Sequence, residues 1–179
     1  MLVTMDRSRI SFRPFACACG LAICSQANSP AVAAPANRNS VVNMIIARPV
    51  SLTKLSDLDF ATLTVSAAGT ATINPATDAV TTTGGVNYLT GASRAAHFRI
   101  DATRLALVII RIPSAPLTLT RLGGTETMTV SNWTLDGFPV RIITNAASTD
   151  FAVGGTLSVA ANQADGTYTG VFSVTADYF

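Results

Sequence analysis

The sequence predicts an all-β protein, an antiparallel β-sandwich of the immunoglobulin-like arrangement, on three observations. Apolar and polar residues alternate through most of the chain from Val42 onward, which is the period of a strand with one buried face. Turn-forming pairs such as Gly123-Gly124 and Asp136-Gly137 separate these segments at intervals of about ten residues. No segment combines a sustained helical period with capping residues. Short strands at this spacing are typical of a sandwich.

The first strands are expected on either side of a proline. Val42, Met44 and Ile46 alternate before Pro49, which has no N–H to donate to a sheet. We predict an exposed extension that ends near Ala47 and a first domain strand that begins near Pro49. A single edge strand bent at Pro49 is the alternative. The next expected strands are Leu58–Val65, Ala71–Asn74, Ala79–Thr83, Val86–Leu89 and Ala95–Ile100, with turns at Ala67–Gly69, Pro75–Asp78, Gly84–Gly85 and Thr90–Ser93.

The most apolar run is Leu105–Ile112, which is followed by Pro113 and Pro116. Its short length and its Val and Ile content favour a central strand over a helix. The remaining strands are expected at Leu117–Leu122, Thr127–Leu135, Val140–Thr144 and Gly155–Val159, with further turns at Gly154–Gly155 and Asp165–Gly166.

The chain ends in a strand. In Gly166–Phe179 (GTYTGVFSVTADYF) mostly apolar residues alternate with polar ones, and Thr, Val, Phe and Tyr suit a half-buried pleated surface. The face expected to be buried carries Tyr168, Gly170, Phe172, Val174, Ala176 and Tyr178.

Residues 1–33 are typical of a secretory signal peptide. Arg7, Arg9 and Arg13 precede the apolar stretch Pro14–Cys24, and small residues follow, with cleavage expected after Ala33 or after Ala27. The apolar stretch is shorter than the roughly 20 residues that span a bilayer, so no transmembrane segment is expected. All three cysteines lie in this leader (Cys17, Cys19 and Cys24), and the exported chain therefore has no disulfide.

Composition argues against disorder and against nucleic-acid binding. The chain is 49% hydrophobic and only 12% charged. Its formal charge of +2 comes from the leader, where Arg7, Arg9 and Arg13 outnumber Asp6, and the rest carries nine basic and nine acidic residues. A neutral chain offers no electrostatic footprint for DNA or RNA.

Residues and motifs that commonly serve in catalysis are scarce, and we expect no catalytic activity, no cofactor and no metal. His97 is the only histidine, and no Gly-x-Ser-x-Gly elbow surrounds a serine. Asp57 and Asp59 lack the remaining ligands of a calcium loop and are interpreted as a solvated strand face. Trp133, the single tryptophan, is interpreted as a core anchor between the sheets.

Two features carry a resemblance. The alternating terminal strand, with Tyr178 in the penultimate position and Gly166 at its start, resembles the C-terminal signature of pilus subunits assembled by the chaperone-usher route. The block from Phe151 to Phe179, with Pro49–Phe60 and Ala71–Val86, is similar to an uncharacterised family of secreted proteobacterial proteins, domain of unknown function 4402. That family is in turn similar to the spore-coat-U domains of archaic chaperone-usher pilins. The family usually has Gly where this chain has Ala61, so the case for a special backbone conformation there is weak.

The resemblance implies a structural subunit of an extracellular fimbria-like filament. The sandwich of residues 49–179 would be incomplete. A chaperone strand in the periplasm would complete it first, and an outer-membrane usher would then exchange that strand for the extension, residues 34–48, of the next copy. The implied donor residues are Val42, Met44 and Ile46, with Val50 as a further candidate, and the implied acceptor residues are Gly166, Tyr168, Phe172, Val174 and Tyr178.

A second interpretation comes from the residues alone. A complete secreted β-sandwich could bind carbohydrate or another surface component as a monomer, with Trp133, Tyr88 and Tyr168 as exposed stacking residues. The two hypotheses differ in whether Val42–Ile46 folds back on its own domain.

Overall fold

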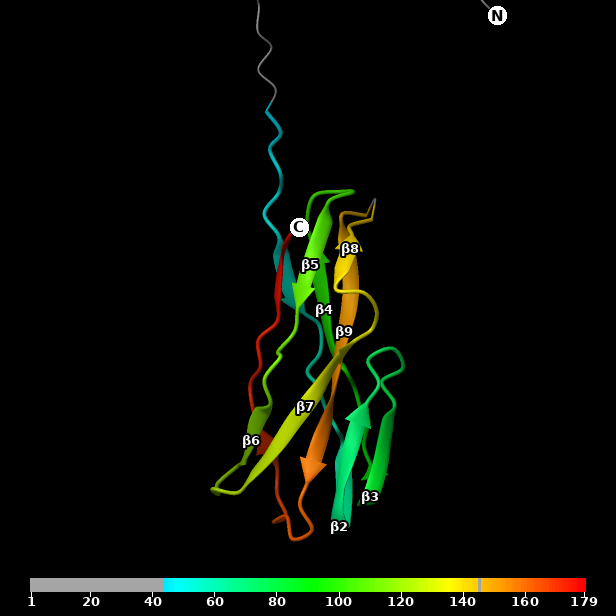
Figure 1. The fold of residues 1–179 in the computed structure, drawn as a ribbon, viewed down its shortest axis with the longest axis vertical. Coiled ribbons are helices and arrows are strands. Elements are labelled where there is room, and N and C mark those ends of the chain that lie inside the picture. Colours follow the sequence, from blue (N-terminus) through cyan, green and yellow to red (C-terminus); the bar gives the residue numbers. More distant parts are fainter. Residues whose placement is uncertain (1–43, 145) are drawn as a thin grey trace, which may run out of the picture. The chain divides into compact units, whose positions relative to one another are not determined.

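The computed structural model describes residues 44–144 and 146–179 (Figure 1). The expected signal peptide, the cysteines, most of the extension and Val42 lie outside the described residues. Residues Met44–Phe179 form one compact unit that contains strands and no helix among the residues described. The expected all-β class is therefore confirmed.

Two antiparallel sheets make up this unit. The larger follows the order β1 (Ser51–Lys54), β4 (Ala96–Asp101), β9 (Ser148–Val159), β7 (Thr127–Leu135), β6 (Leu117–Arg121) and β10 (Tyr168–Thr169), and β2 (Thr62–Ile73) joins it through β9 and carries β3 (Val80–Thr90). The smaller sheet is β11 (Thr175–Tyr178), β5 (Leu107–Arg111) and β8 (Val140–Ile142). The expected strand Leu105–Ile112 is thus central in the smaller sheet.

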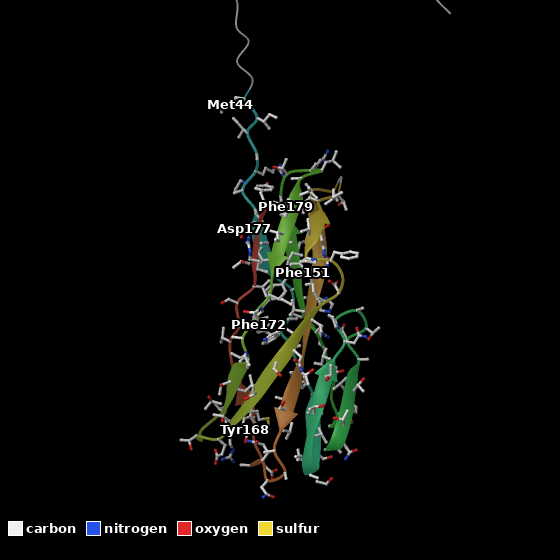
Figure 2. The ribbon with its side chains drawn as sticks, viewed as in Figure 1. Met44, Phe151, Tyr168, Phe172, Asp177 and Phe179 are labelled. Atoms are coloured by element: carbon white, nitrogen blue, oxygen red, sulfur yellow. The ribbon has the colours of Figure 1, made fainter. Side chains whose placement is uncertain are left out.

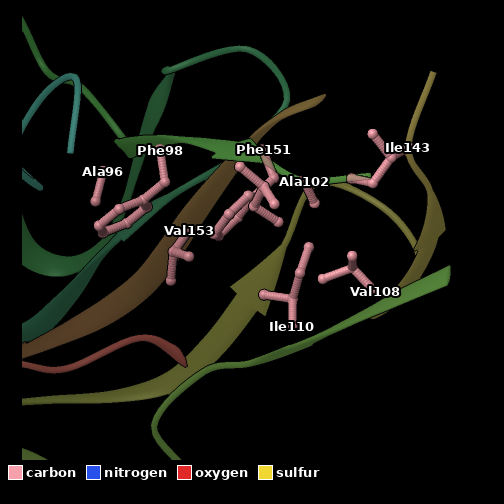
Figure 3. Packing of buried hydrophobic residues seen from close by; sticks show 9 residues of the cluster. Ala96, Phe98, Ala102, Val108, Ile110, Ile143, Phe151 and Val153 are labelled. Atoms are coloured by element: carbon pink, nitrogen blue, oxygen red, sulfur yellow. The ribbon is translucent and has the colours of Figure 1, made fainter. Parts of the chain in front are cut away.

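The main core lies between β5 of the smaller sheet and the strands β4 and β9 of the larger one (Figure 3). Successive strand residues point to opposite faces, so Val108 and Ile110 of β5 turn inward toward Phe98 of β4 and Phe151 of β9. The rings of Phe98 and Phe151 stack with their centroids 5.3 Å apart. The alternation read from the sequence therefore corresponds to an antiparallel β-sandwich with apolar inner faces.

Two of the expected turns lie instead within a β-hairpin. Ala67–Gly69 and Gly84–Gly85 lie inside a long β2–β3 hairpin, with a register shift between Val65 and Gly69. These glycines allow close approach of two backbones: a Cβ added at Gly69 would lie 2.1 Å from the Thr83 oxygen, and one at Gly85 would lie 2.2 Å from the Ala67 nitrogen. The turn expected at Pro75–Asp78 is confirmed, and the Asn74 N–H donates to the Ala79 oxygen across it.

The glycines of β9 are a similar case. Gly154 and Gly155 were expected in a turn, yet β9 runs through them from Ser148 to Val159. A Cβ on Gly154 would lie 2.3 Å from the Ile73 oxygen, and one on Gly155 would lie 3.3 Å from the ring of Trp133. Glycine lets neighbouring segments pack closely against β9 here.

The backbone at Ala61 corrects another expectation. The strand expected at Leu58–Val65 begins only at Thr62, and Ala61 has a φ of 61°, in the left-handed region that favours glycine. Its N–H donates to Oδ1 of Asp59 at 2.8 Å. The special conformation is therefore present although the chain has Ala where the family usually has Gly.

Candidate functional site

One side of the sandwich is open. Strands β1 and β11 come close to each other from the two sheets, but within the described residues β1 pairs only with β4 and β11 only with β5. Each strand therefore has one edge whose N–H and C=O groups are not paired in a ladder. Such an edge is a template for an additional strand.

The core is only partly covered along this side. Apolar residues that pack against the main core while remaining half-exposed come from the two bordering segments: Val50, Leu52, Phe172, Val174 and Ala176. The corresponding positions of β4 and β9, such as Ile100 and Val153, are fully buried. An added strand with apolar side chains would complete the burial of this row.

Phe172 is the largest side chain of the row, and Figure 2 shows it between Tyr168 and Asp177 along the domain. Its ring lies 4.8 Å from the ring of Trp133 and 6.4 Å from that of Phe98, measured between centroids. The preceding residue, Val171, points the other way and is exposed. This segment, Gly170–Val174, lies between β10 and β11 and belongs to no strand. The expected terminal strand is thus split, while its in-out alternation holds.

Two of the predicted acceptor residues lie elsewhere. Tyr168 and Gly166 are near β6, and Figure 2 places Tyr168 toward the end of the domain remote from Phe179. The Tyr168 hydroxyl donates to the Ala164 oxygen at 2.7 Å, and a Cβ on Gly166 would lie 2.6 Å from Nε of Arg121. Both residues hold the loop between β9 and β10. Phe172, Val174 and Tyr178 therefore lie in the part of the terminal segment that leads into the smaller sheet. Gly166 and Tyr168 do not.

Tyr178 makes a contact that the sequence did not indicate. Its hydroxyl donates to the backbone oxygen of Arg48 and accepts the Thr103 N–H at 2.9 Å, and the Arg48 N–H donates to Oγ1 of Thr103 at 2.8 Å. We call this network the Tyr178 clamp. It ties the last strand and the β4–β5 loop to the root of the N-terminal extension.

Beyond the clamp the chain is exposed. Ile45 and Ile46 are 93% and 81% exposed, and Met44 is similar. Val50 lies on the domain side of the clamp and packs partly against its own core. Of the predicted donor residues, Met44 and Ile46 are therefore free at the surface, Val50 contributes to the domain, and Val42 lies outside the described residues. We call the exposed segment Met44–Ala47 the arm.

The residues of the carbohydrate-binding hypothesis are spread over three strands. Trp133 lies on β7, donates its Nε1–H to the Ala115 oxygen at 3.0 Å and packs on Phe172. Tyr88 lies on β3 with its hydroxyl bonded to the Gly91 oxygen, and Tyr168 lies on β10. No ring contact in the described chain joins any two of the three.

The polar residues singled out by the sequence make local contacts. Nε2 of His97 lies 2.9 Å from Oδ1 of Asp78. Burial raises the pKa of Asp78, but the hydrogen bonds from His97 and from the Ala95 N–H outweigh it, and the net pKa is lowered. Asp57 pairs with Lys54. Asp57 and Asp59 border an open hollow of about 320 Å³.

Neither a candidate metal cluster nor a candidate membrane-spanning helix is found in the part of the chain that the structure describes. No cluster of three or more His, Cys, Asp or Glu side chains is placed to hold a metal ion there. No helix in residues 44–144 or 146–179 is long and apolar enough to cross a membrane.

Comparison with known proteins yields one match. Residues 50–178 match the profile of a family described as "Domain of unknown function (DUF4402)". No curated protein and no solved structure matches the chain significantly. The match begins one residue before β1 and ends one residue before the C-terminal Phe179, so it covers the sandwich and leaves the arm outside.

Proposed function

We propose that this chain, which belongs to the DUF4402 family, is a structural subunit of an extracellular pilus-like filament. Copies would join by donor-strand complementation: the extension of one copy occupies the open side between β1 and β11 of the next. The observation that carries the proposal is the open side itself, where two unpaired edges border a row of half-exposed core residues.

The arm has the chemistry of a strand that could fill this side. Main-chain hydrogen bonds to a sheet edge give affinity, and alternate side chains that enter the core give specificity. Met44 and Ile46 are exposed apolar residues two positions apart, so both would point to the same face of an added strand. Burial of each contributes about 1.5–3 kcal/mol, and Val42 would add a third such contribution. Three together are comparable with the stability of an ordinary domain, about 5–15 kcal/mol.

Assembly of this kind propagates. The extension of one copy and the open side of another are different surfaces, so the contact is heterologous and can repeat from copy to copy along a filament. We propose export through the inner membrane, with a periplasmic chaperone that protects the open side and an outer-membrane usher at which copies are joined. The proposed role is structural rather than enzymatic.

The arm itself provides a matched test. In an added strand Ile46 would point into the acceptor and Ile45 away from it. We expect Ile46→Asp to abolish filaments and Ile45→Asp to leave them, as seen by negative-stain electron microscopy of the exported protein. Both residues are exposed in the separate subunit, so circular dichroism should show an unchanged fold for both. Filaments from Ile46→Asp at the native yield would contradict the proposal, and folded monomers from the native chain would favour the carbohydrate-binding alternative.

A further inference from the structure

The smaller sheet has an apolar face on its solvent side. In β5, Val108 and Ile110 turn inward, so Leu107 and Ile109 turn outward. Their partners across the ladder to β8 are Ile142 and Val140. Two more residues extend this face: Phe179, whose N–H donates to the Leu107 oxygen at 3.0 Å, and Phe138, just before β8. We define the outer apolar face as Leu107, Ile109, Phe138, Val140, Ile142 and Phe179.

Apolar residues are unexpected on a sheet face that is exposed only to water. The outward positions of an antiparallel sheet that faces water are ordinarily polar, as they are in β4, where Arg99 faces outward and pairs with Asp150. Phe138 and Phe179 are instead 84% and 76% exposed. Large contiguous apolar patches on a protein surface mark interaction sites. Two charged residues share this outward side: Asp177 is the ladder partner of Ile109, and Arg111 lies two residues after Ile109 on β5. They neutralise each other at 2.6 Å.

The position of the arm indicates what covers this face. The Tyr178 clamp ties Arg48 to the residue that precedes Phe179 in the chain, and Figure 2 shows Phe179 at the same end of the domain as Met44. Only Ala47 separates Ile46 from Arg48 of the clamp, so the distance from Ile46 to Arg48 is about 7 Å when the chain is extended. A copy that holds the arm is therefore kept near this face at high effective concentration. Because the face carries no net charge, a second copy meets no like-charge repulsion.

We propose that the outer apolar face is a second contact between successive copies in the filament, in addition to the donor strand. This inference rests on the proposed function, because the arm is what brings the neighbouring copy to the face. The neighbouring copy packs against the part of the face nearest the clamp, which is Leu107, Ile142 and Phe179. The donor strand binds separately, between β1 and the half-exposed residues Phe172, Val174 and Ala176 of the terminal segment. The donor strand joins the copies, and the face restricts their movement and slows their separation.

The test changes the face without touching the arm or the terminal segment. The double variant Leu107→Thr/Ile142→Thr keeps β-favouring residues on β5 and β8, and Leu89→Thr/Leu122→Thr is the matched control, with two exposed leucines outside the smaller sheet. Filaments of each are placed in guanidinium, and the release of subunits is followed with time. We expect the face variant to form filaments that release subunits at least about tenfold faster than native ones, a loss of about 1.4 kcal/mol. The control should match the native protein.

The outcomes separate this contact from the proposed function. Equal release rates for native, face-variant and control filaments overturn the second contact and leave donor-strand assembly in place. Attachment of filaments to another surface through this face, with release rates unchanged, overturns it as well. Failure of the native chain to form filaments overturns the proposed function and this contact with it. Chemical unfolding of the separate subunits checks that the two double variants remain folded.

Discussion

Strand β9 and the terminal segment Gly166–Phe179 share one sequence pattern and have opposite environments. Both alternate apolar and polar residues in part, but β9 is paired with β2, β4 and β7 and its central residues are buried. The terminal segment pairs through β10 and β11 on one edge only, and its inward-facing residues Phe172, Val174 and Ala176 remain half-exposed. The alternation of apolar and polar residues indicates which side chains point toward the core. It does not indicate whether a further strand covers them.

The largest expected effect comes from two phenylalanines of the same core cluster. Phe151 on β9 is 1% exposed, and its replacement by Ala should lower the free energy of unfolding of the separate subunit by about 3–5 kcal/mol. Phe172→Ala should cost roughly half of that, because its ring is only half-buried. Guanidinium unfolding measures both.

Assembly should reduce this difference between the two substitutions. An added donor strand would cover Phe172 but not change the burial of Phe151, so within filaments the cost of Phe172→Ala should approach that of Phe151→Ala. Equal costs in the separate subunit would mean that the open side is already closed there.

A smaller effect is expected at the clamp. Tyr178→Phe removes the group that accepts the Thr103 N–H and donates to Arg48, at a cost of about 1 kcal/mol. Hydrogen exchange at the Thr103 amide should accelerate, and the backbone at Arg48, where the arm joins the domain, should become more mobile. Tyr168→Phe is the matched control, because its hydroxyl bonds only within the β9–β10 loop. Unchanged exchange at Thr103 in Tyr178→Phe would show that the clamp does not hold the arm.

The sequence predicted the class of fold and the alternation of the terminal segment, since both depend on the local period of side chains. It also predicted an exposed segment before Pro49, and Met44 and Ile46 are exposed. The Tyr178 clamp could not be predicted, because Tyr178 and Arg48 are 130 residues apart and no local pattern links them. The outer apolar face was hidden for another reason: Leu105–Ile112 has the composition of a strand buried on both faces.

The glycines show the same limit. A Gly pair signals either a turn or a close approach of two backbones, and the choice depends on neighbours distant in sequence. Gly84–Gly85 lies opposite the irregular part of β2, so this pair allows a close approach of two backbones and does not form a turn.

Ala61 allows a test in the opposite direction, toward higher stability. It has a φ of 61°, and Ala61→Gly relieves the steric cost of a Cβ in that conformation. Because glycine also loses more entropy on folding, we expect a net gain of about 0.5–1 kcal/mol in the free energy of unfolding. Ala68→Gly is the matched control within β2, where added glycine should destabilise. A loss of stability in Ala61→Gly would mean that the contacts of the Ala61 side chain outweigh the backbone cost.

The smallest effect is expected at Asp78, on the side of the domain away from the terminal segment. The pKa of Asp78 is lowered because hydrogen bonds from His97 and from the Ala95 N–H outweigh the opposing effect of burial. A lowered folded-state pKa gives stability that is present above the unfolded value of 3.8 and is lost as pH falls through the folded value. Asp78→Asn should therefore flatten the fall of unfolding free energy below about pH 4. The change should be small, because the side chain is 39% exposed and solvent screens its charge. Thermal melts of both proteins between pH 2 and pH 7 measure this change. If stability falls equally steeply at low pH in Asp78→Asn, other carboxylates account for the acid sensitivity. Asp150 beside Arg99 is the first of these to examine.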